Sequence, residues 1–131
     1  MSEKFELVKS YLLDLDLEIT REDAAEELVV VADEENGISN LVVDCEEPIV
    51  ILEQMILEVP RNPGDLYRRL LQMNRTLVHG AFVLDEEGKR VIFRDTLQLE
   101  NLDPNELEAS IEALSLGLAE HGRELLSFVS S

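Results

Sequence analysis

Few side chains in this sequence are suited to nucleophilic catalysis: one cysteine (Cys45), two histidines (His79 and His121) and several serines. There is no Gly-x-Ser-x-Gly segment to expose a serine at a strand-to-helix turn. Cys45 lies in a β-branched run among acidic residues, which raise the pKa of a thiol and suppress its reactive thiolate form. We therefore expect Cys45 to be a small buried hydrophobic residue rather than a nucleophile.

Metal and phosphate sites have little support. A calcium loop that started at Asp33 would have its glycine at the fifth place and Asp44 at the twelfth, whereas such loops need glycine sixth and glutamate twelfth. The two histidines lie 42 positions apart without a clustered third ligand, which argues against zinc. Neither a Walker pattern nor Gly-x-Gly-x-x-Gly is present. We expect no catalytic residue, no metal, no cofactor and no enzymatic activity.

Positive charge is concentrated between residues 61 and 94, which hold 7 basic and 4 acidic side chains in a chain of net charge −18. Arg68, Arg69 and Arg75 form a basic stripe on one predicted helix. This stripe has two interpretations. It binds a phosphate or an acidic partner, or it pairs with the chain's own surplus carboxylates, such as those of the first helix or the acidic loop after it. The second interpretation is favoured because acids are so abundant.

The composition is typical of a globular protein with an aliphatic core. The 131 residues are 45% hydrophobic but only 5% aromatic, and the length suits a single domain over residues 1–131. The net charge repels phosphate backbones and anionic bilayers, so we expect neither a nucleic-acid nor a membrane partner. The N-terminal segment lacks a signal-peptide core, and no apolar run approaches the ~20 residues of a membrane span. We expect a cytoplasmic protein.

The first half of the chain predicts one helix and then three strands. Apolar residues at helical spacing indicate a helix over Glu3–Leu15 with Ser2 as its N-cap, and Leu7 and Tyr11 widen its apolar stripe. The acidic stretch Asp16–Glu27 is expected to be a loop, with room for a short extended piece at Leu17–Ile19. The predicted strands are Leu28–Val31, Ile38–Cys45 and Ile49–Val59. The last of them is apolar on both faces, which is typical of a strand that is covered twice or lies at an interface.

The second half predicts a helix, a hairpin and a final helix. A helix begins after Asp65 and continues to His79-Gly80, with its apolar residues on two adjacent lines. Ala81–Leu84 and Val91–Arg94 form a hairpin, in which Phe82 could face Phe93 and Val83 could face Val91. Asp103-Pro104-Asn105-Glu106 is close to a capping box and starts the final helix, which Gly122 could end. The order αβββαββα predicts an α+β fold, an antiparallel sheet packed with helices.

More apolar surface is present than one sheet face needs, and such an excess indicates self-association or a groove for another protein. The alternative is that the three helices cover both faces of the sheet. The candidate residues for a protein-binding or dimer surface come from the two-sided strand and from the last two helices: Ile51, Leu52, Ile56, Tyr67, Leu71 and Leu116.

Residues 64–126 contain a series of local motifs. A helix ends in Leu-Leu-x-x-Asn at Leu70–Asn74, and the strand Gly80–Asp85 is followed by Gly88 and Val91–Arg94. Leu97-x-Leu and Leu102-Asp-Pro-x-Glu-Leu complete the pattern before the last helix. In these motifs the segment resembles the YbjN-like and type III secretion chaperone (Tir chaperone) family. Before residue 64 the likeness lies mainly in the order of elements.

The resemblance implies a small, acidic, cytoplasmic protein without enzymatic activity, usually a homodimer. Secretion chaperones bind an extended segment of an unfolded effector along apolar patches, so the client would add to the sheet or lie over it. YbjN-like members are instead linked to regulation, without a secretion client. The first hypothesis is therefore a dimeric, chaperone-like protein-binding module, and the alternative is a YbjN-like regulatory protein. No client-binding residue is implied by the motifs.

Overall fold

The structure is a computed structural model that describes residues 2–129. It contains three α-helices, two short 3-10 turns and six strands over these residues. In chain order they are α1 (Glu3–Asp14), β1 (Glu18–Asp23), β2 (Leu28–Asp33), η1 (Glu34–Asn36), β3 (Ile38–Glu46), β4 (Ile49–Glu58), α2 (Leu66–Met73), η2 (Asn74–Thr76), β5 (Ala81–Leu84), β6 (Arg90–Gln98) and α3 (Pro104–Ser127).

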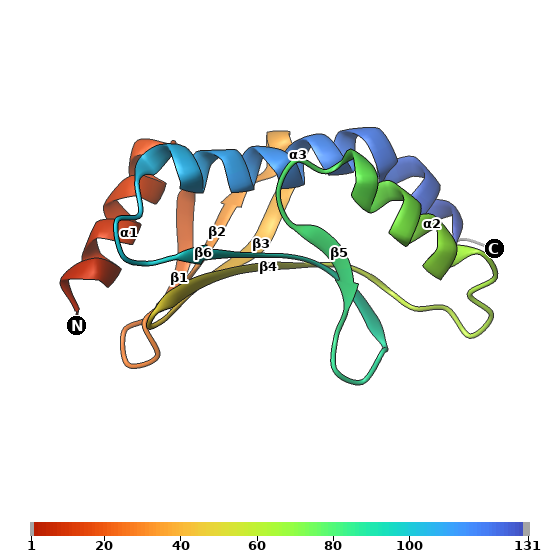
Figure 1. Ribbon diagram of the computed structural model, residues 1–131, viewed down its shortest axis with the longest axis horizontal. Helices are drawn as coiled ribbons and strands as arrows, with labels where there is room; N and C mark the ends of the chain where they lie inside the picture. The colour runs from red at the N-terminus through yellow and green to blue at the C-terminus, as the bar shows by residue number, and fades with distance from the viewer. Residues whose placement is uncertain (1, 130–131) are drawn as a thin grey trace.

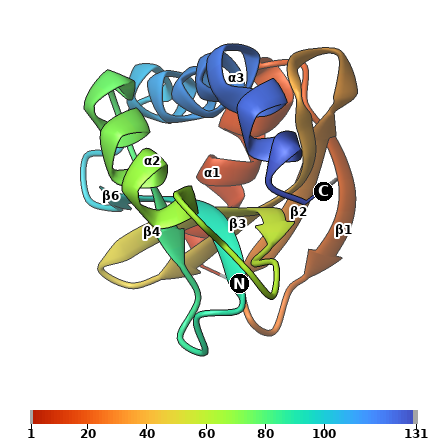
Figure 2. The same cartoon turned by 90° about the vertical axis from the view of Figure 1, so that its right-hand side faces the viewer.

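The strands form one antiparallel sheet in the order β1-β2-β3-β4-β6-β5, and the helices lie together on one side of it (Figures 1 and 2). The chain enters α2 after β4 and returns as β5, and β6 then inserts between β5 and β4. The α+β class and the antiparallel sheet predicted from the sequence are confirmed. Because no helix of the described chain covers the second face, that face of the sheet is left to solvent.

The sheet has one strand more than the sequence predicts, because β1 lies within the stretch expected to be a loop. β1 is an edge strand in which only Ile19 and Asp23 are half-buried, and its pairing with β2 shifts register after Ile19. An edge strand that faces water on most sides has no apolar alternation to reveal it. Charged side chains and a register shift also protect a sheet edge from pairing with another chain.

Helix α1 begins where the sequence predicts. The Ser2 side chain accepts a hydrogen bond from the Phe5 N–H at 3.1 Å and so caps the first turn. Phe5, Val8 and Leu12 are buried against the sheet. Leu7, expected to widen this apolar stripe, lies instead on the exposed side.

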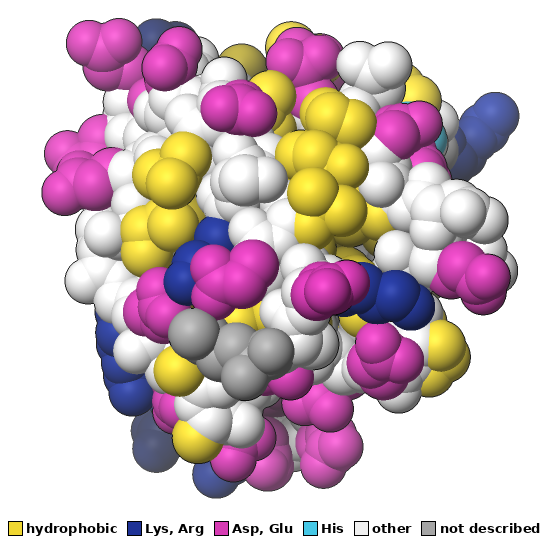
Figure 3. All heavy atoms as spheres, turned by 90° about the vertical axis from the view of Figure 1, so that its left-hand side faces the viewer, with side chains coloured by type: hydrophobic (Ala, Val, Ile, Leu, Met, Phe, Trp, Pro, Cys, Tyr) yellow, Lys and Arg dark blue, Asp and Glu magenta, His cyan; other side chains and the backbone are white. Residues whose placement is uncertain are grey.

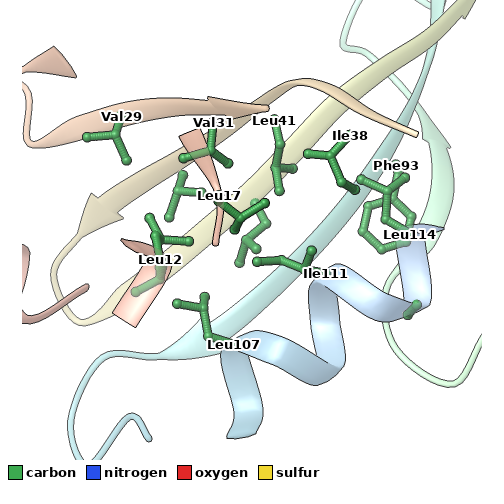
Figure 4. Packing of buried hydrophobic residues seen from close by; sticks show 14 of the residues in the cluster. Leu12, Leu17, Val29, Val31, Ile38, Leu41, Phe93, Leu107, Ile111 and Leu114 are labelled. Carbon is green, nitrogen blue, oxygen red and sulfur yellow. The ribbon is translucent and has the colours of Figure 1, made fainter. Parts of the chain in front are cut away.

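Helix α3 begins with the predicted capping box: Asp103 accepts from the Glu106 N–H at 2.8 Å, and Glu106 accepts from the Asp103 N–H at 3.3 Å. The helix continues through Gly122 to Ser127, so Gly122 does not end it. Leu107, Ile111 and Leu114 meet residues from β2, β3 and β6 in the core, as Figure 4 shows.

Helix α2 is shorter than expected and ends at Met73, after which η2 and an extended Leu77 lead to β5. The polar side chains that follow are bound to other elements: Asn74 bonds to β5 and Thr76 bonds to α3. These tertiary bonds replace another helical turn. In the hairpin, Phe82 faces Phe93 as predicted, whereas Val83 pairs with Ile92 rather than Val91.

The position of β4 in the sheet explains why its sequence is apolar on both faces. Val50, Leu52 and Gln54 face the helices, and a register shift after Met55 brings Leu57 onto that same side. Ile51 lies on the opposite side and is half-buried. None of the helices in residues 2–129 is both long enough and apolar enough to span a bilayer.

Candidate protein-binding surfaces

The structure shows where the residues considered for nucleophilic catalysis lie, beginning with Cys45. Cys45 is buried on the helix-facing side of β3. Burial, and after it the neighbouring carboxylates led by Glu27 and Asp44, together raise the pKa of its thiol to about 12. The thiol is therefore protonated at neutral pH and unreactive.

His121 is buried in α3 with its Nε2 atom 2.8 Å from the Thr76 hydroxyl. The Thr76 hydroxyl donates its only proton in a hydrogen bond to the Met73 carbonyl at 2.7 Å, so its oxygen accepts a hydrogen bond from Nε2–H. A histidine that donates to the hydroxyl cannot remove its proton, and this contact is therefore a structural link between η2 and α3. His79 is exposed in the connection to β5. Within residues 2–129 no group of three or more His, Cys, Asp or Glu residues is arranged to hold a metal ion.

The basic stripe divides in two. Arg69 forms a two-pronged bond to Glu124 of α3, with Nη2 2.8 Å from Oε1 and Nε 2.5 Å from Oε2, and it also donates to Gln72. Arg69 thus pairs with one of the chain's own acids. The sequence analysis expected such acids on the first helix or in the acidic loop after it, whereas the structure places the partner on α3. Arg68 and Arg75 are exposed and form no ion pair with the described residues.

The six apolar candidates fall on different parts of the fold. Leu52 was expected at a binding surface, but it is 0% exposed in the monomer core because its position on β4 points toward the helices. Ile56 lies at the β4 register shift and packs partly against the core. Tyr67 and Leu71 of α2 and Leu116 of α3 are exposed on the helix side, and Ile51 lies on the opposite sheet face.

The exposed apolar residues of α2, α3 and their neighbourhood form what we call the helix-side patch: Tyr67, Leu71, Val78 and Leu116. Leu71, Val78 and Leu116 are 72%, 81% and 65% exposed, so most of each aliphatic side chain faces water. Tyr67 and Leu71 lie one turn apart on α2. Val78 and Leu116 line one groove of about 440 Å³ between η2 and α3, beside Leu77 and Gly117.

The α1 end of the molecule presents further apolar side chains among acids (Figure 3). Leu7 and Leu13 of α1 are exposed there. The sequence indicated that Leu7 widens the apolar stripe of α1, because a helix with many leucines does not by itself show which ones face the sheet.

The second surface is the outer sheet face, which we define by Leu28, Val30, Val42, Asp44 and Ile51. Asp44 pairs across the sheet with Leu28 on one side and with Ile51 on the other. Val42 and its cross-strand partner Val30 lie two residues away on the same side. All five residues are half-buried, and they face away from the helices. Asp44 therefore lies between Leu28 and Ile51, with Val30 and Val42 toward one side and the carboxylate of Glu46 nearby.

The carboxylate of Asp44 is poorly accommodated in the free protein. Its Oδ1 atom is shielded from solvent and has no hydrogen-bond partner among the described residues. Burial, and after it the nearby carboxylates of Glu46, Glu26 and Glu53, together raise the pKa of Asp44 to about 6. Glu53 is itself paired with Arg94, whose Nη1 lies 2.7 Å from Oε2. The outer sheet face thus combines apolar rows with a carboxylate whose shielded Oδ1 atom has no hydrogen-bond partner among the described residues.

Asn74 performs a role that the sequence analysis missed. Its side-chain oxygen accepts from the Phe82 N–H at 2.8 Å, and its side-chain nitrogen donates to the Phe82 carbonyl at 3.1 Å. The amide therefore occupies the free edge of β5 as a neighbouring strand would. The signal in the sequence is the Leu-Leu-x-x-Asn pattern before the strand, but the bonded partner follows only from the fold.

Three solved structures share this fold. YbjN from E. coli, a proposed transcription regulator, has a TM-score of 0.70 at 15% identity, covering 92% of both chains. The Yersinia pestis type III secretion chaperone SycH, in complex with a stable fragment of YscM2, has a TM-score of 0.59 at 14% identity, covering 85% of this chain and 92% of SycH. The HopA1–SchA chaperone–effector complex has a TM-score of 0.62 at 13% identity, covering 91% of this chain and 96% of the matched chain.

No curated protein sequence matches the chain significantly. The family model CesT_Tir_1 matches residues 1–131, so it includes the helix, hairpin and capping motifs that carry the resemblance noted in the sequence. By this match over its whole length, the chain belongs to the CesT_Tir_1 family.

Proposed function

We propose that residues 1–131 form one chaperone-like, non-enzymatic protein-binding domain, which works in the cytoplasm as a homodimer and holds a protein client through apolar surface. The observation that carries this proposal is the helix-side patch, where Val78 and Leu116 line one groove and Leu71 is largely exposed on the neighbouring α2. Exposed apolar surface of this kind costs solvation free energy unless another protein covers it. Two of the structures that share the fold contain a chaperone with a bound protein.

The helix-side patch is better suited to a second copy of the chain than the outer sheet face is. A symmetric contact places each residue near its counterpart or near the same surface of the partner. On the helix side such a contact buries apolar groups, and Arg68 and Arg75 lie on the neighbouring arc of α2 and η2. On the outer sheet face the same contact would oppose Asp44 and its neighbouring acids to identical acids.

The test is the mass of the free protein by light scattering, together with capture of proteins from native lysate. We expect the wild type to have twice the chain mass and Leu71→Glu to be a monomer. Leu13→Glu is the matched control, because it places the same charge on an exposed leucine of α1 and should leave the dimer intact. Proteins identified by mass spectrometry should be captured by the wild type and by Leu13→Glu. A strictly monomeric wild type that captures no protein would refute the proposal.

The second candidate function is that of a YbjN-like regulatory protein without a secretion client. Among the three solved structures described above, YbjN has a higher TM-score than the two secretion chaperones, which favours this alternative. A net charge of −18 opposes direct contact with a DNA backbone, so regulation would act through a protein partner. The genes beside this one distinguish the two roles, because secretion genes next to it favour a chaperone.

A further inference from the structure

We propose that the outer sheet face docks a cationic amphipathic segment of a second protein, with a lysine or arginine of that segment bound to Asp44. This inference rests on the proposed protein-binding function and names the chemistry of the partner and the surface that receives it. It concerns the opposite side of the sheet from the helix-side patch.

The first argument is the layer that the fold lacks. A sheet with apolar side chains on both faces is normally covered on both sides, and here α1, α2 and α3 all lie on one side (Figures 1 and 2). On the other side Leu28, Val30, Val42 and Ile51 form two adjacent cross-strand rows on β2, β3 and β4. A segment with apolar side chains on one face would cover these rows.

The second argument is the Asp44 carboxylate, which lies between Leu28 and Ile51 in one of those rows. Its Oδ1 atom is shielded from water and accepts no hydrogen bond from residues 2–129, a state that costs free energy until a donor arrives. Arg94, a cation of the described chain on the same face, is engaged with Glu53. A lysine or arginine from outside would pair with the carboxylate, and its aliphatic stem would pack against the neighbouring apolar side chains.

The third argument is charge complementarity, which selects among the possible occupants. Glu26, Glu46 and Glu53 surround Asp44, so the field at this face is negative. Nucleic acid and anionic membranes are repelled by it. A second copy of this chain would bring the same acids against their counterparts. A partner segment with positive charge among apolar residues is attracted both by the negative field and by the apolar rows of this face.

The test uses a fluorescent model peptide of about 14 residues, a helix with leucines on one face and a central lysine within that face. Binding is measured by anisotropy at about 150 mM NaCl, so that diffuse attraction to the acidic chain is screened. We expect the wild type to bind it and Asp44→Asn to bind at least about tenfold more weakly, the loss expected for a charged hydrogen-bonded partner. Replacing the peptide lysine with glutamine should weaken wild-type binding equally and leave Asp44→Asn unaffected.

Glu87→Gln is the matched control, because it removes the same formal charge from an exposed residue in the β5–β6 turn. It should bind the lysine peptide within about twofold of the wild type. Ile51→Ser gives a second variant that removes apolar area beside Asp44, and it should also weaken binding. Amide chemical shifts of the wild type should change on β2, β3 and β4.

The proposal is overturned if the wild type fails to bind the peptide, or if Asp44→Asn and Glu87→Gln bind it equally well. Shift changes confined to α2 and α3 would also overturn it, because the peptide would then occupy the helix-side groove. A dimer that dissociates in Ile51→Ser but not in Leu71→Glu would show that a second copy covers this face. The Leu71→Glu variant should bind the peptide like the wild type. Failure of the dimer proposal can therefore be distinguished from failure of the peptide-docking proposal.

Discussion

Asn74 shows how one side chain can close a sheet edge. Its amide makes both backbone hydrogen bonds of Phe82, so α2 and η2 are joined to β5 at a point where an incoming strand would otherwise pair. A client strand that extends the sheet would have to displace this amide at β5. At the other edge, β1 is charged and has a register shift. Both edges are therefore protected, which favours binding over a face rather than along an edge.

Replacing Asn74 with alanine should lower the free energy of unfolding by about 1–3 kcal/mol, because the two Phe82 groups lose their partners. Urea denaturation followed by circular dichroism measures the change. Asn62→Ala is the control, since Asn62 is exposed in the loop before α2 and makes no side-chain hydrogen bond to the described residues. Equal losses in the two variants would show that the Asn74 bonds contribute nothing special.

Asp44 makes stability depend on pH. Its pKa is raised to about 6 in the folded protein and returns to about 4 when the chain unfolds, so the folded state favours the protonated carboxyl. The stabilising contribution of that proton is complete below about pH 4 and is lost as the pH rises through about 6. Asp44→Asn should therefore be more stable than the wild type at pH 7 by about 1–2 kcal/mol, with the difference shrinking toward pH 4.

Urea unfolding of both proteins between about pH 4 and pH 8 measures this dependence. Glu87→Gln serves as the control and should show no such trend. A stability difference for Asp44→Asn that stays constant across this range would mean that the carboxyl does not titrate in it.

At the scale of elements, the connection from η2 to β5 passes close to β6. Gly80 has a positive φ of 71°, and a Cβ placed there would lie 2.5 Å from Cζ of Phe93 and 3.0 Å from the Arg94 carbonyl oxygen. Only glycine permits the chain to turn there directly over β6. This close approach lets Phe82 enter the core and meet Phe93 edge to face, with ring centroids 6.4 Å apart.

Gly80→Ala should therefore lower the free energy of unfolding by about 2–4 kcal/mol, combining backbone strain with a steric clash in the core. Gly88→Ala isolates the strain, because Gly88 has a φ of 69° but no atom within 4 Å of its would-be Cβ, and it should cost about 1 kcal/mol. Thermal and urea unfolding compare the two. If both variants lose the same stability, the contact with Phe93 is not tight.

At the scale of the whole molecule, the two sides of the sheet differ in kind. The helix side carries the basic stripe and an exposed apolar patch, whereas the outer sheet face carries apolar rows around acids. Part of the stripe serves the fold itself, through the Arg69–Glu124 pair. The two surfaces could therefore be occupied together, by a second copy on one side and a client on the other, without competing.

The sequence alone predicted the fold class, four of the six strands to within two residues at each end, and the starts of α1 and α3. These depend on local rules: helical and alternating apolar periods, a serine cap and a capping box. The resemblance in residues 64–126 also came from local motifs, and the family match confirms it.

Tertiary structure decided the rest. β1 is a strand because β2 offers it an edge, and α2 ends at Met73 because Asn74 and Thr76 bond to distant elements. Leu52 and Ile51 are neighbours in sequence, yet one lies in the core and the other on the outer sheet face. Which face of a two-sided strand is covered depends on where the helices pack, and no local pattern contains that information. For the same reason, the sequence could not show that the shielded Oδ1 atom of Asp44 lacks a hydrogen-bond partner among the described residues.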